Sequence, residues 1–217
     1  MKTSKLIVML SFVVISACSF TKQHEKNLAA EAVPLGLQQV NSKRLDAVYL
    51  DKSAIANYKQ VILEPLDLSA VKVRQLSQTN LAYDTPWELN DQDRKYYSER
   101  YQDSMKKEWL DKSGLSQVDQ VSAATLKVKA ILVEISPLGS KDDSKGRPTM
   151  TKVYSEGMGT MTLKIEIADA TSGKVLALIS DQRDLGKIWE ENNRVTFNNK
   201  VRLVFTAWAK NLQKELM

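Results

Sequence analysis

The sequence has very little of the two residue types that most often bind metals in proteins. Among its 217 residues there are one cysteine and one histidine, which excludes an intramolecular disulfide, a thiolate cluster and a zinc site with several histidines. Glycine and proline are also scarce, at 8 and 5, which excludes collagen-like repeats and a disordered chain rich in these residues. Hydrophobic residues make up 43% and charged residues 26%, as in globular proteins. We therefore predict a folded protein with no metal and no cofactor.

The first sixteen residues have the layout of a secretory signal. A short basic start, Met1 to Lys5, precedes an apolar run of eleven residues, Leu6 to Ser16. A helix that spans a bilayer needs roughly 20 apolar residues, so this run is too short for a membrane span. The pattern predicts a signal peptide over residues 1–17.

The signal ends in a motif that resembles the lipobox of bacterial lipoproteins. Ile15-Ser16-Ala17-Cys18 is an aliphatic residue, two small residues and a cysteine. The resemblance implies that signal peptidase II cleaves between Ala17 and Cys18. It also implies a diacylglyceryl group on the Cys18 sulfur and a fatty acid, such as palmitate, on the new amino group. Cys18 is the only thiol, and an unpaired thiol in a secreted protein is otherwise reactive. The alternative is an ordinary signal peptide with a cysteine nearby.

The lipid anchor determines where we expect the protein. Two or three acyl chains hold a protein stably on a bilayer, whereas one chain binds only marginally. By analogy with enterobacterial sorting, Ser19 after the cysteine favours the outer membrane, with the folded part in the periplasm. The formal charge of +5 falls to +3 when Lys2 and Lys5 leave with the signal. This mild excess, without a basic cluster, excludes a nucleic-acid binder.

The mature chain divides into a tether and one domain. Residues 18–45 mix small, polar and charged residues without sustained periodicity, and we expect them to form a flexible tether. His24 falls in this segment and is expected to be a solvated linker residue. Residues 46–217 are long enough for a single hydrophobic core, so we predict one α+β domain in the periplasm.

Four segments have the pattern of β-strands. One of them stops at Pro65, which cannot donate to a β-ladder. Alternation is clearest over residues 160–167, and residues 169–174 read as the turn that follows. Residues 133–135 are a run that is either buried on both faces or bulged. The predicted strands are residues 58–65, 126–135, 160–167 and 175–179.

Two further segments have the spacing of amphipathic helices. The first follows Asn90 or Asp91, which can cap a helix, and ends before Gly114. We expect the apolar positions of both helices to be core rather than a ligand groove. These positions are Tyr97, Tyr101, Met105 and Trp109 in the first helix, and Phe197, Val201, Val204, Phe205, Trp208, Leu212 and Leu216 in the second. The elements together predict a two-layer α+β domain, with about four mainly antiparallel strands packed by two helices.

Four features of the chain stand in an order that is typical of one protein family. They are the lipobox at Cys18, Tyr58-x-x-Val61-x-x-x-Pro65, Asp169-x-x-Ser172-Gly173-Lys174-Val175-Leu176 and Phe205-x-x-Trp208-Ala209-x-x-Leu212. In this order they resemble the bacterial lipoprotein family called domain of unknown function 3313, over most of the mature chain. Because that family has no assigned activity, the resemblance implies an envelope location and an architecture, and no site residue.

The sequence contains no motif that is specific for a catalytic site. Neither Walker nor dinucleotide-binding glycine spacing occurs, and a Ser-His-Asp arrangement would need His24 from the predicted tether. Glu190 and Glu191 are the nearest paired carboxylates, but adjacent residues point apart on a strand or helix. Residues 142–146 (DDSKG) lack the alternating oxygen ligands and final Glu of an EF-hand, so we expect a solvated loop.

One tryptophan lies in a polar segment. Trp189 follows the last predicted strand, in the sequence GKIWEENN of residues 186–193. It either packs under the C-terminal helix or stays exposed as an anchor for a binding partner. We favour packing, and Trp189 is the candidate partner contact if it is exposed.

These observations predict a non-catalytic lipoprotein of the bacterial cell envelope. We expect an accessory or adaptor protein in the outer membrane, whose partner is an envelope protein, a lipid or peptidoglycan. One alternative is a carrier of a small ligand or lipid, with a cavity between sheet and helices. The other is a hydrolase of envelope polymers that uses two carboxylates brought together by the fold.

Overall fold

The structure of the chain is a computed structural model that describes residues 16–74, 87–138, 152 and 154–217. Its helices are α1 (Ser16–Ala32), the 3-10 helix η1 (Val33–Leu35), α2 (Lys52–Ile55), α3 (Asp91–Ser104), the π-helix η2 (Met105–Leu110), α4 (Asp111–Ser113) and α5 (Arg194–Leu216). Its strands are β1 (Gln38–Val40), β2 (Ala47–Leu50), β3 (Gln60–Leu63), β4 (Lys72–Val73), β5 (Ser116–Gln117), β6 (Thr125–Pro137), β7 (Tyr154–Glu156), β8 (Gly159–Asp169), β9 (Val175–Asp184) and β10 (Trp189–Glu191).

A mixed eight-stranded sheet forms the centre of the domain. Its strands run in the order β1-β2-β9-β8-β6-β3-β5, and β4 pairs with β6 beside this path. β3 is parallel to β5 and β6, and β4 is parallel to β6, while the other pairs in this sheet are antiparallel. β7 and β10 form a separate two-stranded antiparallel ribbon.

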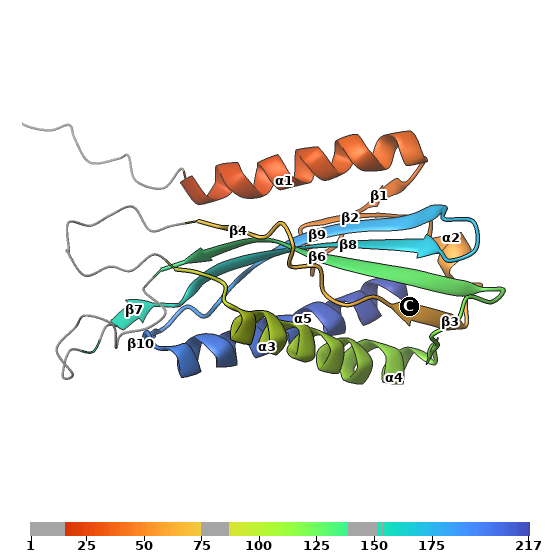
Figure 1. Cartoon of the computed structure of the whole chain (residues 1–217). Coiled ribbons are helices and arrows are strands. Elements are labelled where there is room, and N and C mark those ends of the chain that lie inside the picture. The colour runs from red at the N-terminus through yellow and green to blue at the C-terminus, as the bar shows by residue number, and fades with distance from the viewer. Residues whose placement is uncertain (1–15, 75–86, 139–151, 153) are drawn as a thin grey trace, which may run out of the picture.

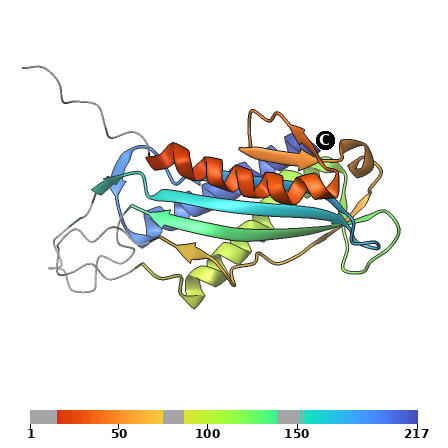
Figure 2. The same ribbon diagram turned by 90° about the horizontal axis from the view of Figure 1, so that it is seen from above.

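Helices cover both faces of this sheet. Figure 1 shows α3 and α5 on one face and α1 on the other, and Figure 2 shows α1 lying over the sheet. The prediction of an α+β domain is confirmed, whereas the expected two layers and about four strands are too few. The missed strands β1, β2, β4 and β5 are two to four residues long. Alternation cannot be recognised over so few residues, and two of these strands pair in parallel.

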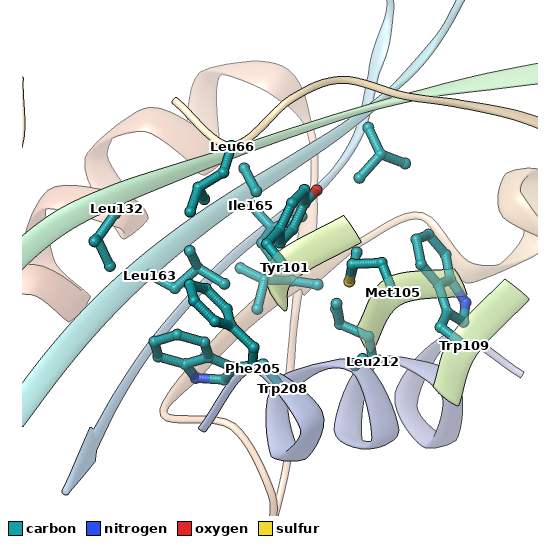
Figure 3. Packing of buried hydrophobic residues seen from close by; sticks show 14 of the residues in the cluster. Leu66, Tyr101, Met105, Trp109, Leu132, Leu163, Ile165, Phe205, Trp208 and Leu212 are labelled. Atoms are coloured by element: carbon teal, nitrogen blue, oxygen red, sulfur yellow. The ribbon is translucent and has the colours of Figure 1, made fainter. Parts of the chain in front are cut away.

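The main core lies between the sheet and the layer of α3, η2 and α5. Figure 3 shows Phe205 and Trp208 of α5 pointing towards Leu163 of β8, with Tyr101 beside them. The ring centroid of Phe205 lies 6.1 Å from that of Tyr101 and 5.5 Å from that of Trp208, both in edge-on arrangements. Every apolar position predicted for the two helices is buried, so the prediction that they form core is confirmed.

The aromatic face of the first long helix needs a change in helical geometry. A spacing of four residues exceeds the 3.6 residues of an α-helical turn, so each step rotates by about 40°. From Tyr97 to Trp109 that rotation would amount to about 120°, and the last side chain would leave the core. Over η2 the chain instead follows the wider π-helical pattern. As a result Tyr97, Tyr101, Met105 and Trp109 all remain buried.

Several local features lie where the sequence predicts them. Asn90 and Asp93 form a reciprocal capping box at the start of α3, with two 3.0 Å hydrogen bonds between side chain and backbone. Gly114 has the left-handed conformation, with φ of 71°, that ends the helical segment. The register of β6 against β8 shifts between Leu132 and Glu134. Residues 133–135 therefore contain a β-bulge, which was one of our two predictions for this run.

Residues 18–45, which we expect to be a flexible tether, contain α1, η1 and β1. Leu28 and Ala32 pack against the outer face of the sheet, and Glu31 forms an ion pair with Lys164 of β8. His24 is half-buried beside β8 rather than solvated. Two apolar residues one turn apart give too little periodicity to reveal this helix. The α1 cluster, as we call this contact, consists of Leu28, Ala32, Leu37, Ala47, Tyr49 and Leu178.

Some expectations fall outside the described residues. The loop at residues 142–146 and the apolar run at residues 6–15 are among them. In the ranges that the structure does describe, no helix combines the length and the apolar character needed to cross a membrane.

Candidate functional site

A pocket opens at the end of the sheet where β6 ends and β8 begins. Its volume is about 500 Å³. It lies at the strand ends and not between the sheet and the helices, where we expected the cavity of a carrier. The residues that line it are Arg74, Ser136, Pro137, Leu138, Glu156, Gly159, Thr160, Asp184, Gly186 and Lys187.

Two glycines let the backbone segments around this pocket approach closely. A Cβ on Gly159, whose φ is 111°, would lie 2.0 Å from the carbonyl oxygen of Ser136. A Cβ on Gly157, whose φ is 74°, would lie 2.3 Å from the carbonyl oxygen of Gly186. The Gly157 N–H also donates to the carbonyl of Ile188 over 2.9 Å. Because only glycine allows such approaches, these positions fix the β7–β10 ribbon to the end of the sheet.

The charged groups of the pocket are largely paired with one another or with neighbours. Arg74 lies 3.4 Å from Glu134, and Lys187 lies 3.0 Å from Asp184. Glu156 and Asp184 are the two carboxylates that line the pocket. Most of the lining surface is nonetheless apolar, as in ligand sites that combine an apolar wall with a few polar groups.

The paired carboxylates that the sequence offers, Glu190 and Glu191, do not act as a pair. Glu190 lies 2.6 Å from Lys200 of α5, whereas Glu191 lies 2.9 Å from Lys152. The pKa of Glu191 is lowered, mainly by its hydrogen bond with Lys152. The two side chains therefore point to different lysines, as expected for neighbours on a strand.

The β7–β10 ribbon presents apolar side chains to solvent beside the pocket. Trp189 is 70% exposed, Ile188 is 63% exposed and Tyr154 is 55% exposed; we call these three residues the ribbon patch. In the ribbon, Trp189 pairs with Glu156 and Glu191 pairs with Tyr154. Tyr154 and Trp189 are therefore diagonal neighbours on one face, within reach of each other. Of our two predictions for Trp189, exposure is therefore correct. The one we favoured, packing under the C-terminal helix, is wrong.

A buried carboxylate joins three elements close to this end of the sheet. Asp181 of β9 accepts a 2.8 Å hydrogen bond from Trp208 Nε1 and a 2.9 Å bond from the Asp46 N–H. It also pairs with Arg183, whose Nη2 lies 3.2 Å from Asp181 Oδ1. Burial raises the pKa of Asp181 to about 6, against the opposing effect of Arg183. Sequence reasoning missed this group, because the predicted strand ends at residue 179 whereas β9 continues to Asp184.

The remaining predicted site residues lie at the start of α1. Ala17 and Cys18 belong to its first turn, and the predicted cleavage and lipid attachment stay predictions. Among the residues that the structure describes, no cluster of histidine, cysteine and carboxylate side chains could hold a metal ion.

A comparison with protein-family models assigns the chain. A model described as "Protein of unknown function (DUF3313)" matches residues 33–212. The chain belongs to this family. The match covers most of the chain and confirms the resemblance seen in the sequence. Among curated proteins, none matches the chain.

Several solved structures align with the chain at low sequence identity and low TM-score. The PelC dodecamer from Paraburkholderia phytofirmans is 8% identical, with 82% of this chain and 96% of that chain covered and a TM-score of 0.38. Protein XCC0632 from Xanthomonas campestris is 10% identical over 72% and 82%, with a TM-score of 0.39. A putative neuraminyllactose-binding hemagglutinin homolog from Helicobacter pylori is 15% identical over 74% and 86%, with a TM-score of 0.37. Similarity at this level says nothing of a shared function.

Proposed function

We propose that this protein is a non-catalytic lipoprotein of the bacterial cell envelope, held in the outer membrane by lipid on Cys18. It acts from the periplasm as an accessory or adaptor of an envelope assembly or transport system. The observation that carries the proposal is the position of Cys18. It follows the apolar run after a single residue, Ala17, and lies in the first turn of α1, about three helical turns before the buried Leu28.

This position suits a lipid anchor because Leu28 and Ala32, the buried residues described in α1, lie ten or more residues after the cysteine. Leu28 and Ala32 hold the helix on the sheet, so acyl chains on Cys18 can enter a bilayer without disturbing the core. The domain has its own large apolar core and needs no disulfide. A lone cysteine is then free for modification.

Labelling in cells tests the anchor. Cells that express the full-length chain are fed an alkyne analogue of palmitate, and membranes are separated on a density gradient. The wild type is expected to carry label and to move with the outer membrane, whereas Cys18→Ala carries none.

Crosslinking with mass spectrometry then tests the adaptor role. A reproducible partner set that is lost in Cys18→Ala supports it, and an empty set from the anchored wild type contradicts it.

A second candidate function is the binding of a small ligand. The specific observation in its favour is the pocket, whose size falls in the range of ligand sites, about 300–1,000 Å³. A thermal-shift screen of lipids and cell-wall fragments tests it, with Thr160→Phe as a variant that fills the pocket. A fragment that stabilises the wild type and leaves the variant unchanged supports this role. Turnover of a glycan that is lost in both Glu156→Gln and Asp184→Asn would instead support a hydrolase.

A further inference from the structure

The Cys18 end of α1 and the ribbon patch lie at the same end of the molecule. Glu31 of α1 pairs with Lys164, and His24 lies beside Thr162, which is nearer to the start of β8. Moving back along α1 therefore means moving towards the start of β8 and the adjoining β7. From His24 to Cys18 the helix continues for about 9 Å in this direction. Figures 1 and 2 both show the start of α1 at the end of the sheet where β7 lies.

The ribbon patch has the composition of a membrane-interface site. Tryptophan and tyrosine concentrate at the level of lipid headgroups, because their rings combine an apolar body with a polar group. The nearby Lys187 is 80% exposed in its side chain and pairs with Asp184, so its apolar stem can lie along the interface while its amine stays at the polar level. Glu191 pairs with Lys152 and Asp184 pairs with Lys187, so of the carboxylates that the structure describes on this surface Glu156, opposite Trp189 in the ribbon, is the one that would face the headgroups as an added negative charge.

We infer that the ribbon patch docks on the bilayer that holds the Cys18 acyl chains, with Trp189 at the level of the headgroups. This inference rests on the proposed lipid anchor. Three side chains bind a membrane weakly on their own, but the anchor confines them near its surface. The second contact then forms at a high effective concentration. The first turn of α1, which contains Cys18, lies at this same end, which is why we assign the patch to lipid rather than to a protein.

The four tryptophans make this docking measurable without a label. Trp87, Trp109 and Trp208 are buried, and Trp189 alone is exposed. The mature, lipidated chain is reconstituted into vesicles of phosphatidylethanolamine and phosphatidylglycerol. A fraction of the lipid carries bromine about 5–10 Å below the headgroups, the depth that interfacial side chains reach. We expect the bromine to quench Trp189 and its emission to shift to shorter wavelength.

Variants assign the signal to the ribbon patch. Trp189→Phe should abolish the quenchable emission, because the three remaining tryptophans are buried. Ile188→Ser should reduce the quenching of Trp189. Its matched control is Val121→Ser, which removes a comparably exposed aliphatic side chain from the loop before β6, at the opposite end of that strand. This control should leave the quenching unchanged.

The outcomes separate a failure of the docking from a failure of the anchor. Mass spectrometry of the Cys18 peptide reports the anchor directly. An acylated chain whose Trp189 is quenched by aqueous acrylamide and not by brominated lipid overturns the docking and leaves the anchor intact. Crosslinks from position 189 to another protein, without lipid quenching, also overturn it. A mature chain with an unmodified Cys18 overturns the anchor and the docking together.

Discussion

The two faces of the central sheet are covered in very different ways. On one face, α3, η2 and α5 bury a large core that contains seven aromatic side chains, Trp87, Tyr97, Tyr101, Trp109, Phe197, Phe205 and Trp208. On the other face, α1 contributes to a cluster of six buried residues. Around that cluster the sheet presents Thr162, Lys164 and Gln182. The first face holds the fold together, and the second holds one helix.

This difference predicts two levels of stability within one chain. Apolar burial contributes about 25 cal/mol for each Å² removed from water, so the face with the aromatic core dominates the free energy of unfolding. A helix held by a small cluster and an ion pair can open locally at much lower cost. For a lipid-anchored protein, this places the weakest contact between the anchor and the domain.

The largest effect is expected from truncation in the aromatic core. Phe205→Ala removes a buried ring that lies between Tyr101 and Trp208. We expect the free energy of unfolding to fall by about 3–5 kcal/mol, because the transfer term and the cavity add. Urea denaturation followed by circular dichroism measures it. Leu203→Ala, which is on the same helix but half-exposed, is the matched control and should stay within about 0.5 kcal/mol of wild type.

The second effect concerns pH and the buried Asp181, which lies on the side of the aromatic core. Its pKa is raised from 3.8 to about 6, mainly by burial. The folded state therefore holds a proton on Asp181 at a pH where the unfolded chain has lost it. Its contribution to stability is present below the unfolded pKa and is lost as pH rises through about 6. The change amounts to roughly 3 kcal/mol, at about 1.4 kcal/mol for each pKa unit.

Asp181→Asn isolates this contribution. The variant keeps an acceptor for Trp208 and cannot titrate, while Arg183 and Asp46 remain beside it. Between about pH 4 and pH 6, the stability of the wild type minus that of the variant should fall as pH rises. Other carboxylates, such as Asp169 with its lowered pKa, cancel in this difference. A difference that stays flat over that range contradicts the assignment.

The third effect tests whether α1 opens on its own. Leu28→Ala truncates the α1 cluster and should cost about 2 kcal/mol of local stability. Hydrogen exchange of α1 should accelerate, while the urea midpoint of the main transition hardly moves. Leu35→Ala, at a half-exposed position just after α1, is the matched control. One cooperative transition that shifts as a whole would show that the two faces unfold together.

The face with the aromatic core could be predicted well from the sequence. Long elements carry many repeats of their pattern, so the alternation from Met161 to Ile167 and the helical spacing from Phe197 to Leu216 were unambiguous. The π-helical segment could not be foreseen as such. The sequence nevertheless contains a hint of it, because four core residues at a strict spacing of four do not stay on one face of a straight α-helix.

The other face and the candidate site could be predicted only in part. α1 has too few apolar residues to show its face, and β1, β2, β4 and β5 are too short to alternate. Trp189 could be singled out because a tryptophan in a polar segment is unusual. Its exposure depends on pairing between β7 and β10, more than thirty positions apart along the chain, which local patterns do not encode. The same holds for Asp181, whose partners come from α5 and from the segment before β2.

The smallest predicted effect concerns two ion pairs, one that holds α1 on the sheet and one within the main domain. Glu31 and Lys164 join α1 to β8, whereas Glu64 and Lys127, 2.8 Å apart, lie within the main domain beside β3 and β6. These side chains are all partly exposed, so each pair should be worth about 0.2–1 kcal/mol and should weaken with salt. Double-mutant cycles with Gln and Met replacements measure both couplings, by hydrogen exchange and by urea denaturation. We expect the first coupling to appear in the exchange of α1 alone and the second in global unfolding. If the Glu31–Lys164 coupling appears in global unfolding at full size, α1 is part of the cooperative core and does not open on its own.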